Sequence, residues 1–304
     1  MCLQIYMSQL KINTHSIIGK LASVDLPSTQ IDLTSLTACN SMQSQALGRR
    51  VFKIDQHGKS WWLKGQIKGI NTLSEQSFLN ELDTYQKLII LQVSFLLPFQ
   101  IFKPIKIQNS TELTLNVQVP CQGTQNIWLE QGLKVQHAAA LFDQEPEQLS
   151  TDHVIQILLQ SLDILNALHG VGWIHGDLKI EHFRVDQSQC YLIDFEQAHT
   201  FETKFPQISA TPRYMAPELF HGEAKTVQTD IYALGIIWLQ WLTQQKLSEK
   251  SYLDWAYLHC QHLKVHLPPQ FLHLTTILNA MLEKHKQQRC TNIYQIKQIL
   301  SDIV

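Results

Sequence analysis

The stretch HGDLKIEHF, residues 175–183, brings two histidines, a carboxylate and a lysine together between a helix-like pattern and a short strand-like pattern. Asp177 can accept the proton of a hydroxyl group, and Lys179 can neutralise the charge of a phosphoryl group in transfer. Taken alone, this pattern is a weak signal, because an aspartate that caps a turn beside a solvated lysine is more common. The stretch therefore raises phosphoryl transfer as a hypothesis that other parts of the chain must support.

A second carboxylate follows at the end of an apolar strand pattern. The segment YLIDFEQA, residues 191–198, places Asp194 17 residues after Asp177. A carboxylate at such a strand end can hold a magnesium ion over a triphosphate. A strand-terminal aspartate in an ordinary turn is the plain alternative, and two matches at this separation make it the weaker one.

Two further segments carry a family resemblance. ATPRYMAPELF spans residues 210–220, and TDIYALG spans residues 229–235. Together with residues 175–182 and 194–196, they resemble the H-R-D-L-K-x-x-N, D-F-G, A-P-E and D-x-W-A-L-G motifs of eukaryotic-type serine/threonine protein kinases. The resemblance covers roughly residues 45–300. It implies a fold of two lobes and transfer of the γ-phosphoryl group of ATP to a hydroxyl group.

The resemblance also implies a role for each motif residue of the second lobe. Asp177 would orient the acceptor hydroxyl group and take its proton, Lys179 would stabilise the γ-phosphoryl charge, and Asp194 would bind the divalent metal. His175 would support the loop, and Asp230 would anchor its backbone. Another expected contact joins two segments: Arg289 of KHKQQRCT would pair with the A-P-E glutamate, Glu218.

In the first lobe, the resemblance points to nucleotide-binding residues. Lys64 of WWLKG matches the strand lysine that holds the α- and β-phosphates, and Glu81, 17 residues on, matches the helix glutamate that pairs with it. Gly48 and Val51 fit the end of the glycine loop over the phosphates. Glu130 falls where the hinge between the lobes should begin, so its backbone would meet adenine.

Three departures fall inside the motifs. His182 replaces the asparagine that holds a second magnesium ion, and imidazole is a poor ligand for magnesium but a better one for manganese or zinc. Glu196 replaces the D-F-G glycine, and its carboxylate beside Asp194 is hypothesised to offset the lost metal ligand. Gly176 replaces the arginine that reads a phosphate on the activation segment. Activity is therefore expected not to depend on phosphorylation within residues 196–216.

The first lobe departs further from the family pattern. Only Gly48 remains of the three loop glycines, so nucleotide affinity is expected to be modest. Trp62 stands where a small residue usually roofs adenine, so either the local alignment is displaced or the pocket holds a bulky ring. The weak glycine loop, the aromatic residues before Lys64 and the D-x-x-x-x-H-F pattern resemble the bacterial lipopolysaccharide core kinases, which phosphorylate a sugar hydroxyl group.

Three functions stay open. A serine/threonine kinase-like enzyme is favoured, because Lys179 lies two residues after Asp177 and Thr211 lies five residues before the A-P-E alanine, as in kinases of that type. Tyr214 and Met215 would shape the acceptor platform. A lipopolysaccharide core sugar kinase is the alternative. The third is a pseudokinase scaffold that binds nucleotide or a partner without turnover, although such proteins usually lose at least one of the charged residues kept here.

The expected fold is α+β, a bilobal protein kinase-like fold with a small β-rich first lobe containing one main helix and a larger, mainly helical second lobe. Residues 1–40 form an extension of unknown role, residues 41–132 the first lobe and residues 133–304 the second. Apolar periodicity and turn residues predict the elements. These are a hairpin over 51–65, helices over 74–92, 151–170, 229–245 and 271–285, and strands over 112–119, 126–132 and 190–195.

Bulk properties exclude several classes of protein. The net charge of −2 gives no basic excess for nucleic acid. The six cysteines are scattered without a C-x-x-C pair and the N-terminus lacks a secretory signal, which favours a cytoplasmic protein. The apolar run over residues 88–102 is too short to span a bilayer. The expected cofactors are ATP and Mg²⁺, with Mn²⁺ as an alternative, and the expected partner is a hydroxyl acceptor on a protein; nothing indicates the oligomeric state.

Overall fold

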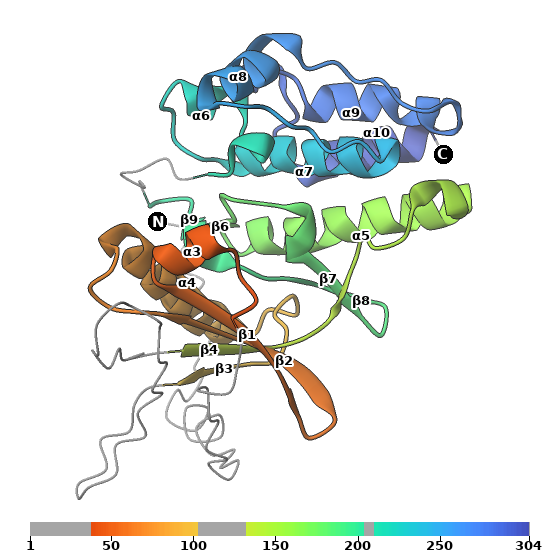
Figure 1. The fold of residues 1–304 in the computed structure, drawn as a ribbon. Helices are drawn as coiled ribbons and strands as arrows, with labels where there is room; N and C mark the ends of the chain where they lie inside the picture. The colour runs from red at the N-terminus through yellow and green to blue at the C-terminus, as the bar shows by residue number, and fades with distance from the viewer. Residues whose placement is uncertain (1–37, 103–131, 204–209, 304) are drawn as a thin grey trace, which may run out of the picture. The chain divides into compact units, whose positions relative to one another are not determined.

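The computed structural model describes residues 38–102, 132–203 and 210–303. Within them, a four-stranded sheet and one long helix form a first lobe, and a mainly helical part with two small sheets forms a second lobe (Figure 1). This arrangement confirms the expected bilobal α+β fold. The strand predicted over 112–119 lies outside the described residues, and so does the strand predicted over 126–132 except for Gly132. The extension and the lobe boundaries stay predictions.

The sheet of the first lobe is built around a tight hairpin. Strands β1 (Arg49–Gln56) and β2 (Lys59–Gln66) are antiparallel, and β4 (Gly132–Gln136) and β3 (Phe99–Phe102) complete the order β1-β2-β4-β3. The two turn residues between β1 and β2 both have positive φ, as a type I′ turn requires, and one of them is a glycine. The predicted hairpin is confirmed, with a turn of two residues.

The register of the sheet decides which side chains share a face. Val51 lies opposite Lys64, and Lys64 lies opposite Leu133. Directly opposed residues of antiparallel strands point to the same face, and so do residues two apart on one strand. Arg49 therefore lies on the same face as Lys64.

Helix α4 (Thr72–Ile90) covers this face of the sheet. The helix begins after Asn71, whose side chain accepts a hydrogen bond from the Ser74 amide. Its buried positions recur at helical spacing and include Phe78, Glu81, Leu82, Tyr85 and Leu88. The helix predicted over 74–92 is present; it ends two residues earlier, and Gln92 takes a left-handed backbone conformation with φ of 54°.

The second lobe packs around two long helices, α5 (Thr151–Gly170) and α7 (Val227–Thr243). Helix α7 is buried on nearly every side, and Gly235 allows close packing, because a Cβ there would lie 2.9 Å from Leu282. Among the described residues, the other α-helices of this lobe are α6 (Pro217–Phe220), α8 (Tyr252–Tyr257), α9 (Thr275–Met281) and α10 (Ile293–Ile303), and the short helix α3 (Met42–Ala46) precedes β1 in the first lobe. The small strands are β5 (Ala139–Ala140), β6 (Trp173–Ile174), β7 (Phe183–Asp186), β8 (Gln189–Leu192) and β9 (His199–Thr200).

The predicted helix over 271–285 is wrong at both ends. A 3₁₀ segment, Pro269–Leu274, precedes α9, which stops at Met281. Beyond the helix end, the Glu283 carbonyl accepts from the Nε of Arg289 at 2.8 Å, so a tertiary contact and not a further helical turn satisfies it. In the part of the chain that the structure describes, no helix is long and apolar enough to cross a membrane.

Candidate active site

The backbone of the loop at residues 175–182 is anchored by Asp230, near the start of α7. One carboxylate oxygen accepts from the Gly176 amide at 2.9 Å; the other accepts from the His175 amide at 2.8 Å and lies 3.0 Å from His169 Nε2. Burial alone would raise the pKa of Asp230, but His169, His175 and the Gly176 amide outweigh it and hold the pKa below its usual value. The expected anchoring of the loop backbone by Asp230 is confirmed.

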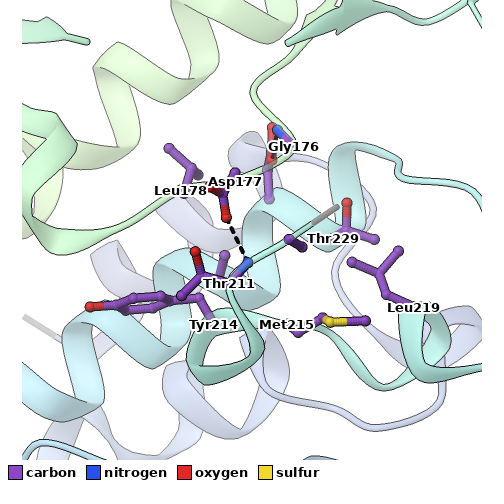
Figure 2. Close-up of a pocket in the computed structure, with 11 residues that line it drawn as sticks. Gly176, Asp177, Leu178, Thr211, Tyr214, Met215, Leu219 and Thr229 are labelled. Atoms are coloured by element: carbon purple, nitrogen blue, oxygen red, sulfur yellow. Dashed lines mark hydrogen bonds between the residues drawn. The ribbon is translucent and has the colours of Figure 1, made fainter. Parts of the chain in front are cut away.

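Asp177 lies between a lysine and the segment that precedes the A-P-E motif. One of its oxygens accepts a hydrogen bond from the Thr211 amide at 2.8 Å, and the other lies 3.1 Å from Lys179 Nζ. Figure 2 shows this contact, with Tyr214 and Met215 on the same segment as Thr211. Burial would raise the pKa of Asp177, but Lys179 and His182 with the Thr211 amide lower it below its usual value. Asp177 is thus a carboxylate at neutral pH.

Lys64 is the centre of a group of charges between the lobes. Its Nζ lies 2.5 Å from Asp194 Oδ1, 2.6 Å from Glu196 Oε1 and 2.8 Å from Glu81 Oε2. Burial would lower the pKa of Lys64, but Asp194, Glu196 and Glu81 together raise it. Burial raises the pKa of Glu81 to about 7 against the attraction of Lys64. The structure therefore shows the pairing of Lys64 with Glu81 that the sequence predicted, and it adds Asp194 and Glu196 as partners of Lys64.

Glu196 has two cationic partners. Besides Lys64, its Oε1 lies 3.0 Å from Arg49 Nη2 on β1. Arg49 is buried and lies over the ring of Phe78 of α4. The carboxylate that replaces the D-F-G glycine is thus held against the sheet of the first lobe. Sequence reasoning missed Arg49; its position two residues before Val51, on the face of Lys64, was the available signal.

The imidazole of His182 contacts the carboxylate of Asp194. His182 Nε2 lies 3.1 Å from Asp194 Oδ2, and the imidazole is stacked on His175 with ring centroids 5.4 Å apart. Its Nδ1 is buried and has no hydrogen-bond partner among the residues that the structure describes. The carboxylate oxygens of Asp194 are hard donors that suit magnesium, whereas an imidazole suits softer ions. The oxygen donors that could hold a magnesium ion are thus the carboxylates of Asp194, Glu196 and Glu81, whose ligand atoms lie within 4.8 Å of one another.

Phe195, at the phenylalanine position of the D-F-G motif, packs between helix α4 and the loop at residues 175–182. Phe195 is fully buried, and its ring lies 5.2 Å from that of Tyr85 on α4 and 5.4 Å from that of His175 in the loop. Burial lowers the pKa of His175 to about 4, so the imidazole is neutral at neutral pH. Its Nε2 lies 3.2 Å from the Ile193 carbonyl, which fits the structural role expected for His175.

The sequence also singled out Gly48, Val51, Trp62 and Glu130 for the nucleotide site. Gly48 has a φ of 90°, and a Cβ there would lie 2.6 Å from the Gln66 side chain, so local packing accounts for this glycine. Val51 is half-buried opposite Lys64. Trp62 donates from Nε1 to His137 Nδ1 at 3.0 Å. Glu130 lies outside the described residues.

Comparison with known proteins decides the family. Residues 107–302, more than half of the chain, match the profile of the protein kinase domain. The chain belongs to the protein kinase domain family. The matched range contains Asp177, Lys179, His182 and Asp194 but begins after Glu81. The assignments in the first lobe therefore depend on the geometry of the kinase fold described above.

Individual relatives cover only parts of this kinase chain. It is 29% identical over 157 residues, 49% of this chain and 56% of the relative, to a protein of Acanthamoeba polyphaga mimivirus named as a putative serine/threonine-protein kinase. It is 36% identical over 102 residues, 32% of this chain and 16% of the relative, to the probable serine/threonine-protein kinase PknB of Lactococcus lactis. A Caenorhabditis elegans protein named as a putative tyrosine-protein kinase is 31% identical over 119 residues, 36% of each chain. The chain thus spans at most about half of these relatives.

Proposed function

We propose that this kinase domain transfers the γ-phosphoryl group of ATP to a serine or threonine hydroxyl group. The observation that carries the proposal is one connected arrangement: Lys64 is paired with Glu81 and Asp194, and Asp177 is paired with Lys179 and Thr211. Phosphoryl transfer needs positioning and charge stabilisation more than covalent chemistry, and these groups supply both. We also propose a cytoplasmic location, from the scattered cysteines.

Each residue has a defined part in the proposed mechanism. Lys64, oriented by Glu81, holds the α- and β-phosphates of ATP. Asp177 is ionised, so it can orient the incoming hydroxyl group and accept its proton. Lys179, 3.1 Å from Asp177, stabilises the negative charge of the γ-phosphoryl group. Asp194 would hold the divalent metal, which neutralises phosphate charge when bound. The sequence assigned a metal-binding role to His182 as well; its Nε2 lies against Asp194, which suits a residue that orients that carboxylate.

The acceptor class is proposed from the segment that contacts Asp177. Thr211 approaches Asp177 through its backbone amide, and Arg213 is fixed by its Nε bond to the Leu247 carbonyl at 2.9 Å. A peptide acceptor needs such an ordered segment beside the catalytic carboxylate, whereas a sugar hydroxyl group does not. This favours a protein acceptor over a lipopolysaccharide sugar.

The test is phosphate transfer from labelled ATP with magnesium or manganese. Wild type and Asp177→Ala are each offered serine, threonine and tyrosine peptides, generic protein substrates and a lipopolysaccharide extract. We expect label on serine or threonine with wild type only. Label confined to the lipopolysaccharide fraction would establish the sugar kinase instead, and no label from folded protein that binds ATP would establish the scaffold.

The metal preference is expected to depend on His182. In His182→Asn, an amide oxygen replaces the imidazole, and oxygen is the donor that magnesium prefers. The ratio of activity with Mg²⁺ to activity with Mn²⁺ should therefore rise by about tenfold over wild type, in line with the usual effect of changing a group at a metal site. Steady-state rates across a titration of each metal measure it. An unchanged ratio would remove His182 from the metal site.

Activity is expected not to need phosphorylation of the segment over 196–216. Gly176 carries no cation that could bind a phosphate there, and the segment is already bound to Asp177 through Thr211. Thr200→Ala, Thr203→Ala and Ser209→Ala should each keep the wild-type rate within about twofold, as is usual for changes at the surface; Ser209 lies outside the described residues. Phosphatase treatment is the matched control. Loss of activity in a folded variant would contradict the expectation.

A further inference from the structure

The backbone of Gly176 is packed against a lysine from another part of the chain. Gly176 has a φ of 76°, and a Cβ added there would lie 2.7 Å from the Gln197 carbonyl oxygen, 3.0 Å from Lys225 Cδ and 3.4 Å from Lys225 Nζ. The side chain of Lys225 therefore runs along the residue that precedes Asp177. Lys225 comes from the loop before α7 and is 7% exposed.

The ammonium group of Lys225 is bonded to the segment that follows Asp194. Lys225 Nζ donates to Gln197 Oε1 at 3.2 Å, and Gln197 Nε2 donates to Ser77 Oγ on α4 at 3.2 Å. A neighbouring residue of α4, Asn80, donates to the backbone carbonyls of this segment at Glu196 and Ala198, at 3.0 and 2.9 Å. Lys225 thus packs against Gly176 of the catalytic loop, and hydrogen bonds through Gln197 link its ammonium to Ser77 of α4, four residues before Glu81.

The charges around Lys225 come from three elements. Asp177 of the catalytic loop and Asp230 of α7 attract the ammonium, and His199 of β9 lies close enough for Lys225 to lower its pKa. Burial lowers the pKa of Lys225 to about 8, although both carboxylates oppose that shift. The group is therefore mainly charged at neutral pH. A buried ammonium is stable only where such groups compensate it.

We propose that Lys225 is a positioning residue for phosphoryl transfer: its ammonium holds the catalytic loop and the segment after Asp194 together and, through Gln197, keeps α4 and Glu81 in place. This rests on the proposed function, since the property that Lys225 supports is the rate of that transfer. The connection is part of the folded chain and needs no added phosphate. If the Lys225 ammonium is removed, the Gln197 amide oxygen loses its hydrogen-bond donor, and Asp177 and Asp230 lose a compensating charge.

The test compares Lys225→Met, Lys225→Arg and Gln197→Met with wild type, and with Lys264→Met as a matched exposed control. Lys225→Met keeps an unbranched chain of similar length but removes the charge, and we expect kcat to fall about 10- to 100-fold, the scale expected when a reacting group is misplaced. KM for ATP should rise less than kcat falls, because Lys64 itself is retained and only the position of Glu81 beside it changes. Gln197→Met should lower kcat in the same direction, and Lys225→Arg should retain most of it, because its charge is kept.

The pH profile separates positioning from a structural role. Wild-type kcat should fall as pH rises through about 8 and Lys225 loses its proton. In Lys225→Arg this fall should be absent, because a guanidinium stays charged. The contribution of Lys225 to stability has the opposite pH dependence. Its pKa is lower in the folded protein than in the unfolded chain, so above about pH 8 the unfolded chain binds more protons. This group therefore makes folding more favourable as pH rises toward its usual pKa. Loss of the Lys225 proton therefore does not itself favour unfolding, and the unfolding transition measured at each pH separates a fall in kcat from loss of the fold.

Hydrogen exchange tests the connection through Lys225 without a measurement of activity. In Lys225→Met, amides over residues 77–81 and 195–199 should exchange faster than in wild type, while α10 is unchanged. Unchanged exchange in these segments, or an unchanged kcat and pH profile in a folded Lys225→Met, would overturn the proposal. If wild type transfers no phosphate, the proposed function fails; faster exchange would then still support the connection through Lys225, and unchanged exchange would refute it.

Discussion

Lys64→Met is expected to lower kcat/KM by about 100- to 1,000-fold, the usual scale for removing a charged group that stabilises a transferring phosphoryl group. The variant removes the cation that lies within 2.8 Å of Asp194, Glu196 and Glu81. Three carboxylates then face one another, and the pKa of Glu81, already raised to about 7, should rise further. KM for ATP should rise and kcat should fall, and steady-state kinetics over a range of ATP concentrations will separate the two effects.

A lysine on the same strand provides the control. Lys59 of β2 is exposed, and its Nζ makes only a long contact of 3.4 Å with Gln136 Oε1 among the contacts described. Lys59→Met should therefore leave kcat/KM within about twofold, as is usual for a change at an exposed site. Equal rates for Lys64→Met and wild type would show that Lys64 does not hold the nucleotide.

Arg289→Met is expected to destabilise the protein by about 3–5 kcal/mol, the usual cost of removing one partner of a buried ion pair. Arg289 binds Glu218 through two parallel contacts of 2.7 and 2.9 Å, as the sequence predicted. The guanidinium also donates to the carbonyls of Gln228 and Glu283 and lies 4.8 Å from the ring centroid of Tyr232. Its loss leaves the buried Glu218 carboxylate without its two guanidinium donors and releases the segment after α9. Thermal or urea unfolding measures the change.

An exposed pair in the same region gives the matched control. Lys286 Nζ lies 3.6 Å from Glu223 Oε2, and the glutamate side chain is 51% exposed. Exposed ion pairs contribute little, so Lys286→Met should change the free energy of unfolding by less than about 1 kcal/mol. The double variant Glu218→Leu with Arg289→Met should be less destabilised than the sum of the single changes, since no charge is left unpaired. Equal effects of Arg289→Met and Lys286→Met would contradict the account.

Much of the second lobe could be predicted because its motifs depend on short-range spacing. Asp177, Asp194, Glu218 and Asp230 each occur in a local pattern that resembles a kinase motif, and that resemblance implied the loop anchor and the pair with Arg289. The hairpin of β1 and β2 was also predictable, because His57-Gly58 suits a two-residue turn.

Other features depend on contacts between distant segments. Arg49 and Lys225 have no motif of their own, and their partners, Glu196 and Gln197, become neighbours only when the lobes and loops are in place. The strand β3 lies in an apolar run that periodicity cannot distinguish from a helix end. The carbonyl of Glu283, just beyond the end of α9, bonds to Arg289, a tertiary contact that the local pattern does not encode.

The most direct measurement is single-turnover phosphate transfer by Asp177→Asn with saturating ATP, beside the affinity of the same variant for ATP. Asparagine keeps the shape of the side chain and its acceptor oxygen for the Thr211 amide but cannot take a proton. We expect ATP to bind within about threefold of wild type and transfer to fall by about 100- to 10,000-fold, the range typical of a general base. Transfer at the wild-type rate would show that Asp177 is not the catalytic carboxylate and would contradict the proposed mechanism.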